Sequence, residues 1–375
     1  MELAKKTSLL ICAVLACGVL TGCQMGRGMY VPGMRDHYKF EELAKHHPTT
    51  RIGTLANSAM VALTWDSSKL GKHGYTPNGS ERNGVVYTCR GGHLDLAHVR
   101  NVADWTGYLA SKSYWNINND NETFSFKLGE DAMCFVDIKY PDNWKDISDE
   151  DKDTAARDIS FGLGQYLAHQ FSVWHEIITW FGYKSVGVYP EFKSAFSWED
   201  TYSDLLGSRI GYAALRNNEY CFSDAVTLAL DQEMANLGIQ HRNVARVAAQ
   251  KMRSKKCKDL VPTANIETRN FDVGVDDGNI TPWIVPSVGS CQQEPPQAYP
   301  VPDLKFLDKY GFSIKFQIEP KVWEKTKIMK VVYGDDYKKT NLIEPSEHFG
   351  KVMTYIEQQA AKKFGVLNSH KNTTN

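Results

Sequence analysis

Apolar side chains dominate one long stretch in the middle of the chain, residues 159–181, where charged residues are rare. A helix that is apolar on nearly every side is typical of a buried core element. Charged residues at 149–152 precede this stretch, and Gly182, a residue type favoured just after a helix end, follows it. The pattern therefore predicts a long central helix over residues 154–181.

Shorter amphipathic patterns flank the central stretch. Asp95, His98 and Trp105 recur at i, i+3 and i+10, which places them on one face of a helix. Ser197 is followed closely by two acidic residues, which is typical of a helix N-cap. Flanking helices are expected over 95–112, 197–215, 223–237, 241–254 and 346–364.

Short segments rich in β-branched and aromatic residues predict strands. Residues 84–89 form one such segment, and two glycines end it. Residues 124–128 and 133–140 predict a hairpin with a turn between them. From 262 to 300 the chain is rich in proline, glycine and aspartate, and residues 275–280 have the pattern of a hairpin turn.

Together these elements predict an α+β fold that is predominantly helical. We expect a central buried helix with flanking helices, small antiparallel β elements and a β-containing C-terminal segment. The main domain, with the candidate site, is expected over residues 51–260. Residues 261–375 are expected to form a β-containing extension and a C-terminal helix packed on that domain.

The N-terminus has the pattern of an export signal. Two lysines precede an apolar run at 9–20, which is short for a membrane span. The run ends in the sequence LTGC at 20–23, which resembles the bacterial lipobox, where the cysteine is acylated and becomes the mature N-terminus. The alternative is an ordinary secretory signal with a cysteine there by chance.

The lipobox resemblance implies a signal peptide over 1–22, a lipid anchor at Cys23 and a tether over 23–50. The acyl chains would hold the protein at a lipid bilayer while the polypeptide stays in water. The resemblance also implies a location in the bacterial cell envelope. Gln24 follows the cysteine where aspartate would signal retention, which favours the outer membrane, facing the periplasm.

The charge balance bears on which partners the protein binds, and the cysteine content bears on which disulfides it forms. The chain has 43 basic and 44 acidic residues and no long run of either sign, so no nucleic-acid partner is expected. The cysteines beyond residue 23 form no C-x-x-C pair, and the oxidising envelope permits one or two disulfides with at least one thiol left over. Their pairing stays open. These cysteines are Cys89, Cys134, Cys221, Cys257 and Cys291.

The sequence WHEIITWFG at 174–182 carries the strongest candidate chemistry. The zinc helix of many metallopeptidases has the pattern H-E-x-x-H, in which two histidines one turn apart bind the ion and the glutamate is the general base. His175 and Glu176 match the first two positions, whereas Thr179 replaces the second histidine. A histidine in a buried helix is also common as a hydrogen-bonded core residue.

The sequence SWEDTYSDLLG at 197–207 resembles the second metal helix of thermolysin-like (gluzincin) peptidases, in which a glutamate is a zinc ligand. Glu199 lies 24 positions after His175, close to the separation usual in that family. Asp200, however, has the family's spacing to the Ser-Asp pair that follows. The resemblance implies that one of these two acids is a metal ligand and leaves open which.

The sequence GGHLDLAHVR at 91–100 offers a further ligand. His93 and His98 are the candidates to complete a zinc site, and Asp95, three residues before His98, would orient the imidazole of His98 or share the ion. The alternative is a helix that Asp95 caps, with a structural His98. Arg100 is expected to pair with Asp104 one turn later.

The lipobox together with the segments at 91–100, 174–182 and 194–207 resembles a family of bacterial lipoproteins without an established activity. One hypothesis is a zinc-dependent hydrolase of a peptide or other amide bond, with a peptide or cell-wall substrate. A second is a non-catalytic lipoprotein that binds a cell-wall component or partner protein through an aromatic cleft, with Trp105, Trp174, Trp180 and Trp198 as its anchors, although most of these are expected in the core. A third is a degenerate hydrolase scaffold without metal. The first hypothesis assigns zinc to His175, Glu199, His98 and Asp200, and catalysis to Glu176 and Asp95.

Overall fold

The computed structural model describes residues 34–51, 68, 70–77, 79–129, 131–185, 189–190, 192, 194–252, 269–288, 291 and 294–364. The expected signal peptide, Cys23, the first part of the expected tether and Cys257 lie outside these residues. Within the described ranges, every helix is too short or too polar to cross a membrane.

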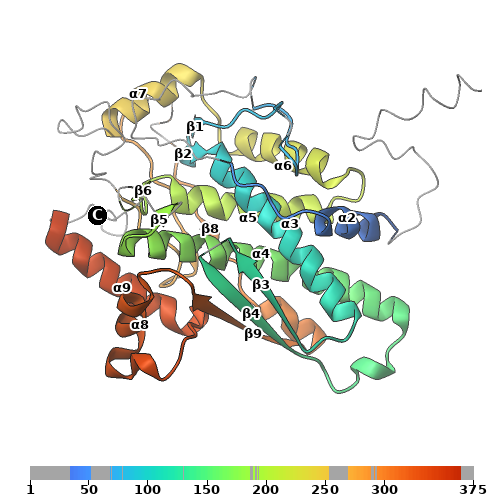
Figure 1. Ribbon diagram of the computed structural model, residues 1–375. Helices are drawn as coiled ribbons and strands as arrows, with labels where there is room; N and C mark the ends of the chain where they lie inside the picture. The colour runs from blue at the N-terminus through green and yellow to red at the C-terminus, as the bar shows by residue number, and fades with distance from the viewer. Residues whose placement is uncertain are drawn as a thin grey trace, which may run out of the picture.

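Helices form most of the core, as the sequence predicts (Figure 1). α3, α4 and α5 pack against one another at its centre. The helices are α2 Met34–Ala44, α3 Leu96–Asn118, α4 Asp149–Phe181, α5 Asp200–Arg216, α6 Phe222–Asn236, α7 Arg242–Met252, α8 Lys325–Tyr333 and α9 Pro345–Phe364, with short 3-10 turns η3 Trp144–Asp146, η5 Lys305–Tyr310 and η6 Gly334–Lys338.

α4 is the predicted central helix, and most of its residues from Ala155 onward are buried. It begins earlier than expected because the Ser148 hydroxyl accepts the N–H of Asp151, and three acids in the first turn face the positive end of the helix dipole. Gly182, with φ of 111°, ends it in the left-handed conformation that glycine adopts without strain.

The start of α5 differs from the prediction. Ser197 does not cap it; the helix begins at Asp200, with Glu199 in the cap position and no side-chain cap. The expected capping hydrogen bond from the helix to the Ser197 side chain is replaced by one in the opposite direction, in which the backbone N–H of Ser197 donates to the carboxylate of Asp200. The acids at this end therefore hold the preceding turn.

The predicted hairpin is confirmed, as β3 Thr123–Leu128 and β4 Ala132–Lys139, and it gains a strand from far along the chain. β9 Ser313–Pro320 pairs antiparallel with β4, giving the order β3-β4-β9. The rings of Phe126 and Phe316 stack across this sheet at 6.3 Å between centroids. The C-terminal segment is thereby built into the same core as the central helices.

Three two-stranded pairs accompany this sheet in the described residues. The strand predicted over 84–89 forms β1 and pairs with the residues just after the glycines. The hairpin expected at 275–280 is wrong, because β7 there pairs with β8, beyond a long connection. The pairs are β1 Val85–Thr88 with β2 Gly92–Asp95, β5 Lys184–Ser185 with β6 Tyr189–Pro190, and β7 Asn279–Ile280 with β8 Tyr299–Pro300.

Glycines set the spacing of the three central helices. A Cβ on Gly207 of α5 would lie 2.5 Å from the carbonyl oxygen of Val99 in α3, and one on Gly211 would lie 2.8 Å from that of Ala103. On α4, a Cβ on Gly164 would lie 2.6 Å from the carbonyl oxygen of Thr106. The backbones therefore approach more closely than any side chain would allow.

A buried ion network attaches the chain before β1 to α3. The guanidinium of Arg51 binds both oxygens of Glu81, at 2.6 and 2.7 Å, and lies 2.7 Å from the carboxylate of Asp104. His73 lies between the two acids, 3.1 Å from Glu81 and 2.9 Å from Asp104. The expected pairing of Arg100 with Asp104 is wrong. Arg100 instead donates to backbone carbonyls of this upstream segment, because Arg51 and His73 already occupy Asp104.

A disulfide joins Cys89, directly after β1, to Cys291, 202 residues later. The sequence predicted one or two disulfides without their pairing. Among the described cysteines, Cys134 and Cys221 are free thiols. The disulfide links the end of β1 to the segment around residues 285–291, whose apolar side chains pack against Tyr87 and Cys89.

The glycine contacts make a testable prediction. We expect Gly207→Ala to lower the free energy of unfolding by about 1–3 kcal/mol, since overpacking at a close backbone contact outweighs the better helix propensity of alanine. Gly350→Ala is the matched control, because Gly350 lies in exposed helix with no atom near its added Cβ. It should be neutral or stabilise by up to about 1 kcal/mol. Urea unfolding of both variants measures this, and equal effects would contradict the packing argument.

Candidate functional site

Acidic side chains from all three central helices meet near the N-terminal ends of α3 and α5. α3 contributes its cap residue and first turn, α4 contributes its second half, and α5 contributes its first turns. The five carboxylate residues are each 7% exposed or less. This acidic cluster consists of Asp95, Glu176, Glu199, Asp200 and Asp204, together with His98.

His98 is the imidazole of the cluster. Its Nδ1 lies 3.3 Å from Oδ1 of Asp200 and 3.7 Å from Oδ1 of Asp204. The side chain of His98 is 27% exposed, so solvent reaches the cluster here. The structure therefore brings together His98 and Asp200, two of the four residues expected to bind metal. Asp204 was missed as a site residue, although its i+4 spacing from Asp200 could have indicated it.

Glu176 faces the start of α5 and is held by backbone. The N–H of Phe196 donates to its carboxylate at 2.5 Å, and the next N–H, of Ser197, donates to Asp200 at 3.1 Å. Phe196 has φ of +55°, which is uncommon for a bulky residue and costs about 1–3 kcal/mol. The strained turn thus directs two consecutive N–H groups at two carboxylates.

Arg269 secures that turn and was not predicted. Its guanidinium donates to the carbonyl oxygen of Ala195, and the N–H of Asn270 donates to that of Phe196 at 3.0 Å. Burial lowers the pKa of Arg269 to about 10, while the charges of Glu176 and Asp200 act to raise it. No sequence pattern indicates Arg269, because it lies in an irregular segment far from α5.

Asp95 caps α3, which is one of the two roles left open by the sequence. Its carboxylate accepts the N–H of Ala97 at 2.7 Å, and its own N–H donates to the hydroxyl of Ser203 at 3.0 Å. Its charge also acts on His98. Glu199 is buried beside Asp200, and its Oε2 has no hydrogen-bond partner.

His175 lies at the edge of the cluster and is the most exposed of the expected ligands. Its Nδ1 is 4.0 Å from Oδ2 of Asp131, and its side chain is 39% exposed. Its ring meets that of Tyr183 edge to face. Thr179, at the position of the second histidine of the zinc pattern, is buried, and its hydroxyl has no hydrogen-bond partner.

The other candidate histidine near α3 is structural. His93 is fully buried, accepts a hydrogen bond from Nε1 of Trp198 at 3.2 Å, and lies 3.3 Å from the carbonyl oxygen of Ala245. Burial lowers its pKa to about 4, so it is neutral at physiological pH. The tryptophans expected to form a binding cleft are also core residues, each 8% exposed or less: Trp105, Trp174, Trp180 and Trp198.

Electrostatics in the acidic cluster favour bound protons or a bound cation. Burial raises the pKa of Glu176, Glu199 and Asp200, and it raises that of Asp204 to about 7 against the opposing charge of His98. Burial acts to lower the pKa of His98, but Asp200, Asp95 and Asp204 together raise it to about 10. The environment therefore favours the cationic form of His98, and these four acids hold their protons to higher pH than exposed carboxyl groups do. Among the described residues, no three His, Cys, Asp or Glu side chains are already arranged to hold an ion.

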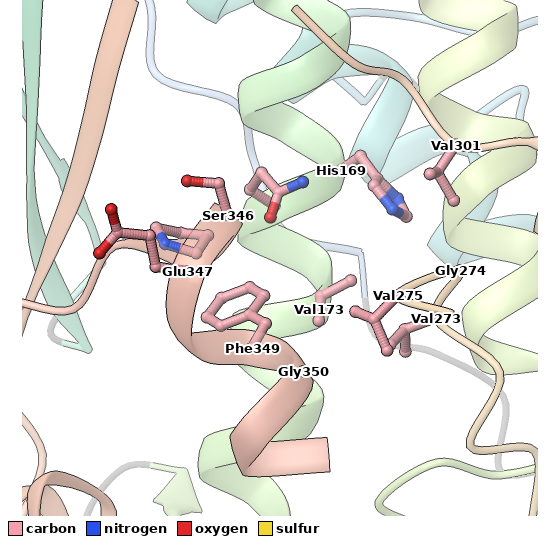
Figure 2. Close-up of a pocket in the computed structure, with 12 residues that line it drawn as sticks. His169, Val173, Val273, Gly274, Val275, Val301, Ser346, Glu347, Phe349 and Gly350 are labelled. Carbon is pink, nitrogen blue, oxygen red and sulfur yellow. The ribbon is translucent and has the colours of Figure 1, made fainter. Parts of the chain in front are cut away.

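A separate cavity of about 240 Å³ lies beside residues 169–173 of α4, which precede Glu176 in that helix (Figure 2). It is bounded by His169 and Val173 of α4, by residues 273–275, and by the first turns of α9. His169 is buried, its Nδ1 has no hydrogen-bond partner, and burial lowers its pKa to about 4. The cavity walls combine valine side chains and Phe349 with a few polar groups, and Glu347 is their only carboxylate, so the cavity differs in chemistry from the acidic cluster.

The raised pKa of Asp204 makes stability depend on pH. The folded protein keeps a proton on Asp204 up to about pH 7, whereas the unfolded chain releases it near pH 3.8, so stability falls as the pH rises through this window. Asp204→Asn cannot titrate, and we expect its loss of stability between pH 5 and pH 8 to be smaller by about 2 kcal/mol. Chemical denaturation at several pH values measures the two slopes. Asp308→Asn, on the surface, should keep the wild-type slope, and an unchanged slope in Asp204→Asn would contradict the assignment.

Comparison with known proteins identifies the family of the chain. A family described as "Protein of unknown function (DUF4056)" matches residues 52–273, more than half of its length. No curated protein and no solved structure matches significantly. The matched residues include the whole acidic cluster, the strained turn and Arg269. The chain belongs to the DUF4056 family.

Proposed function

We propose that this protein is a lipid-anchored hydrolase of the bacterial cell envelope that binds a divalent metal ion, zinc in the first instance, at the acidic cluster. Its substrate would be a peptide or another amide of the cell wall. The observation that carries the proposal is the burial of five carboxyl groups beside one partly exposed imidazole at the junction of three helices. Hydrophobic cores do not accumulate such groups for stability, since each buried charge costs several kcal/mol unless it is compensated.

The charges of the cluster support a cation. Five carboxyl groups face two cationic side chains, His98 and Arg269, and the excess of acid is balanced in the structure by raised pKa values. A divalent ion would replace those protons. Carboxylates gather both in metal sites and in clusters where acids share protons. A metal site also needs an imidazole or carboxylate atom that is available to bind the ion.

The donor atoms fit such an ion. Oε2 of Glu199 is a buried atom without a hydrogen bond. Asp200 and Asp204 lie 3.3 and 3.7 Å from Nδ1 of His98, which would release its proton when it binds the ion. Because no three donors converge in this conformation, binding would draw the carboxylates inward. The proposed ligands are His98, Asp200 and Asp204, with Glu199 as an alternative carboxylate. Unlike the peptidase-like set, this set does not include His175.

The bound ion would act as a Lewis acid that polarises an amide carbonyl and acidifies water. Glu176 is the group placed to accept a proton, because the N–H of Phe196 fixes one oxygen of its carboxylate. Its raised pKa makes it a stronger base once ionised. Arg269 holds the turn that carries Phe196 and adds a positive charge beside the site. His98 and the partly exposed His175 lie where a substrate would enter.

Metal content tests the hydrolase proposal. We expect protein purified without chelators to hold one equivalent of zinc, or to take up zinc or manganese, with an affinity that increases from pH 6 to pH 8 as the acids lose protons. His98→Ala and Asp200→Asn should each lose the ion, whereas the exposed His46→Ala should keep it. Elemental analysis and calorimetric titration measure both, with circular dichroism to confirm folding. Wild-type protein that binds no metal at any pH would refute the proposal.

The variant His175→Ala separates the two possible ligand sets. A peptidase-like site would lose its metal with His175, whereas the set centred on His98 would retain it. Hydrolysis of mixed peptides and of cell-wall fragments by the loaded protein, abolished in Glu176→Gln, would then identify the substrate. Metal that binds without any hydrolysis would favour the degenerate scaffold.

Lipid attachment is tested separately. We expect metabolic labelling with palmitate to label the wild-type protein, and Cys23→Ser to remove the label, because acylation occurs at the lipobox cysteine. Cys221→Ser keeps the lipobox and should stay labelled. Unlabelled wild-type protein recovered in the soluble periplasm would show an ordinary secretory signal instead.

A further inference from the structure

Trp323 is the most exposed large apolar side chain in the described part of the protein. It is 95% exposed, in the turn between β9 and α8. Tryptophan is normally well covered in folded proteins. The other exposed large apolar side chains found there are 50% exposed or less, and they lie just before α6, on α6, on α7 and in the 275–277 turn. Trp323 therefore does not belong to a wider apolar patch.

Lysines flank Trp323 in the sequence, in the turn and along α8. The segment 321–330 has four lysines and one glutamate, whereas the whole chain has a net charge of −1. Lys321 and Lys325 both approach Glu319, at 2.8 and 3.8 Å. Lys327 and Lys330 are exposed, and neither forms an ion pair with a described residue.

α8 fixes the direction of these side chains. It buries Ile328, Met329 and Val332 toward α9, so its opposite side faces solvent. Lys327 and Lys330, three residues apart, lie on that outer side. The N–H of Lys325 donates to the carbonyl oxygen of Val322, which places Trp323 in the turn that leads into the helix. Figure 1 shows α8 with α9 at one extremity of the molecule. The turn and the outer side of α8 thus present an indole among basic groups.

We propose that Trp323, with Lys321, Lys327 and Lys330, docks the protein onto an anionic lipid surface. Indole rings favour the headgroup region of bilayers, where the ring is apolar and its N–H remains hydrogen-bonded. Lysines beside it complement the phosphates of anionic lipids. A protein partner fits less well, since stable protein interfaces need a contiguous, well-packed area of about 800 Å² on each side. The proposal does not depend on acylation of Cys23 or on the acidic cluster; with an acyl anchor, the patch would orient the folded body on the membrane.

Vesicle binding tests the proposal. The chain carrying Cys23→Ser is produced without residues 1–22, so that it has neither the expected signal peptide nor an acyl group. It is mixed with vesicles of phosphatidylcholine alone or with about one-third phosphatidylglycerol, and bound protein is measured by co-sedimentation. We expect binding to the anionic vesicles that weakens with salt. Trp323→Ala should weaken it about tenfold, and Lys327→Gln and Lys330→Gln about fivefold each.

Tyr220→Ala is the matched control, because Tyr220 is an aromatic side chain exposed at 45% near the start of α6. It should bind as the Cys23→Ser chain does. Equal binding by Trp323→Ala, or no preference for anionic vesicles, would overturn the proposal. Self-association that depends on Trp323 without vesicle binding would also overturn it, in favour of a contact between copies of the chain. Thermal melting of each variant confirms that the fold is retained.

Discussion

The close approach of α3 to α4 and α5 is the constraint on which the rest of the structure depends. Gly164, Gly207 and Gly211 permit backbone contacts that no side chain would allow. Because the helices are so near, the cap of α3, the second half of α4 and the start of α5 share one small buried volume. The acids found there are adjacent because the backbones are adjacent. Function and packing are therefore coupled, and a change in helix spacing would alter both.

Local patterns in the sequence predicted α3 to α7 and α9, because helix periodicity, caps and terminal glycines are properties of neighbouring residues. They did not predict α2, which lies within the expected tether, or α8. The hairpin β3-β4 was also predicted from local patterns. β9 was not, since its partner strand lies far away in the chain and nothing near residues 313–320 indicates the pairing. The wrong hairpin at 275–280 has the same origin: a turn pattern specifies the turn but not which strand pairs with the residues after it.

In the candidate site, too, residues in short local motifs were predicted, and residues that act through distant contacts were not. The sequence indicated His98, Glu176 and Asp200 through short motifs, and the structure brings these three together. Arg269 and the strained Phe196 turn escaped prediction because they act through tertiary contacts and backbone conformation. The expected pairing of Arg100 with Asp104 failed because a helix-spacing rule was applied to a buried aspartate, and Arg51 and His73 compete for it from another segment.

The placement of β9 has a consequence for the order of events during biogenesis. Until residue 320 has emerged, β4 has an unpaired edge, and the disulfide partner of Cys89 becomes available only shortly before that point. A chain that emerges from its N-terminus thus exposes this edge while about half of its residues, 140–320, are still to follow. Exposed edges recruit other strands, so we expect correct folding to require that β4 is kept from other strands until β9 has emerged.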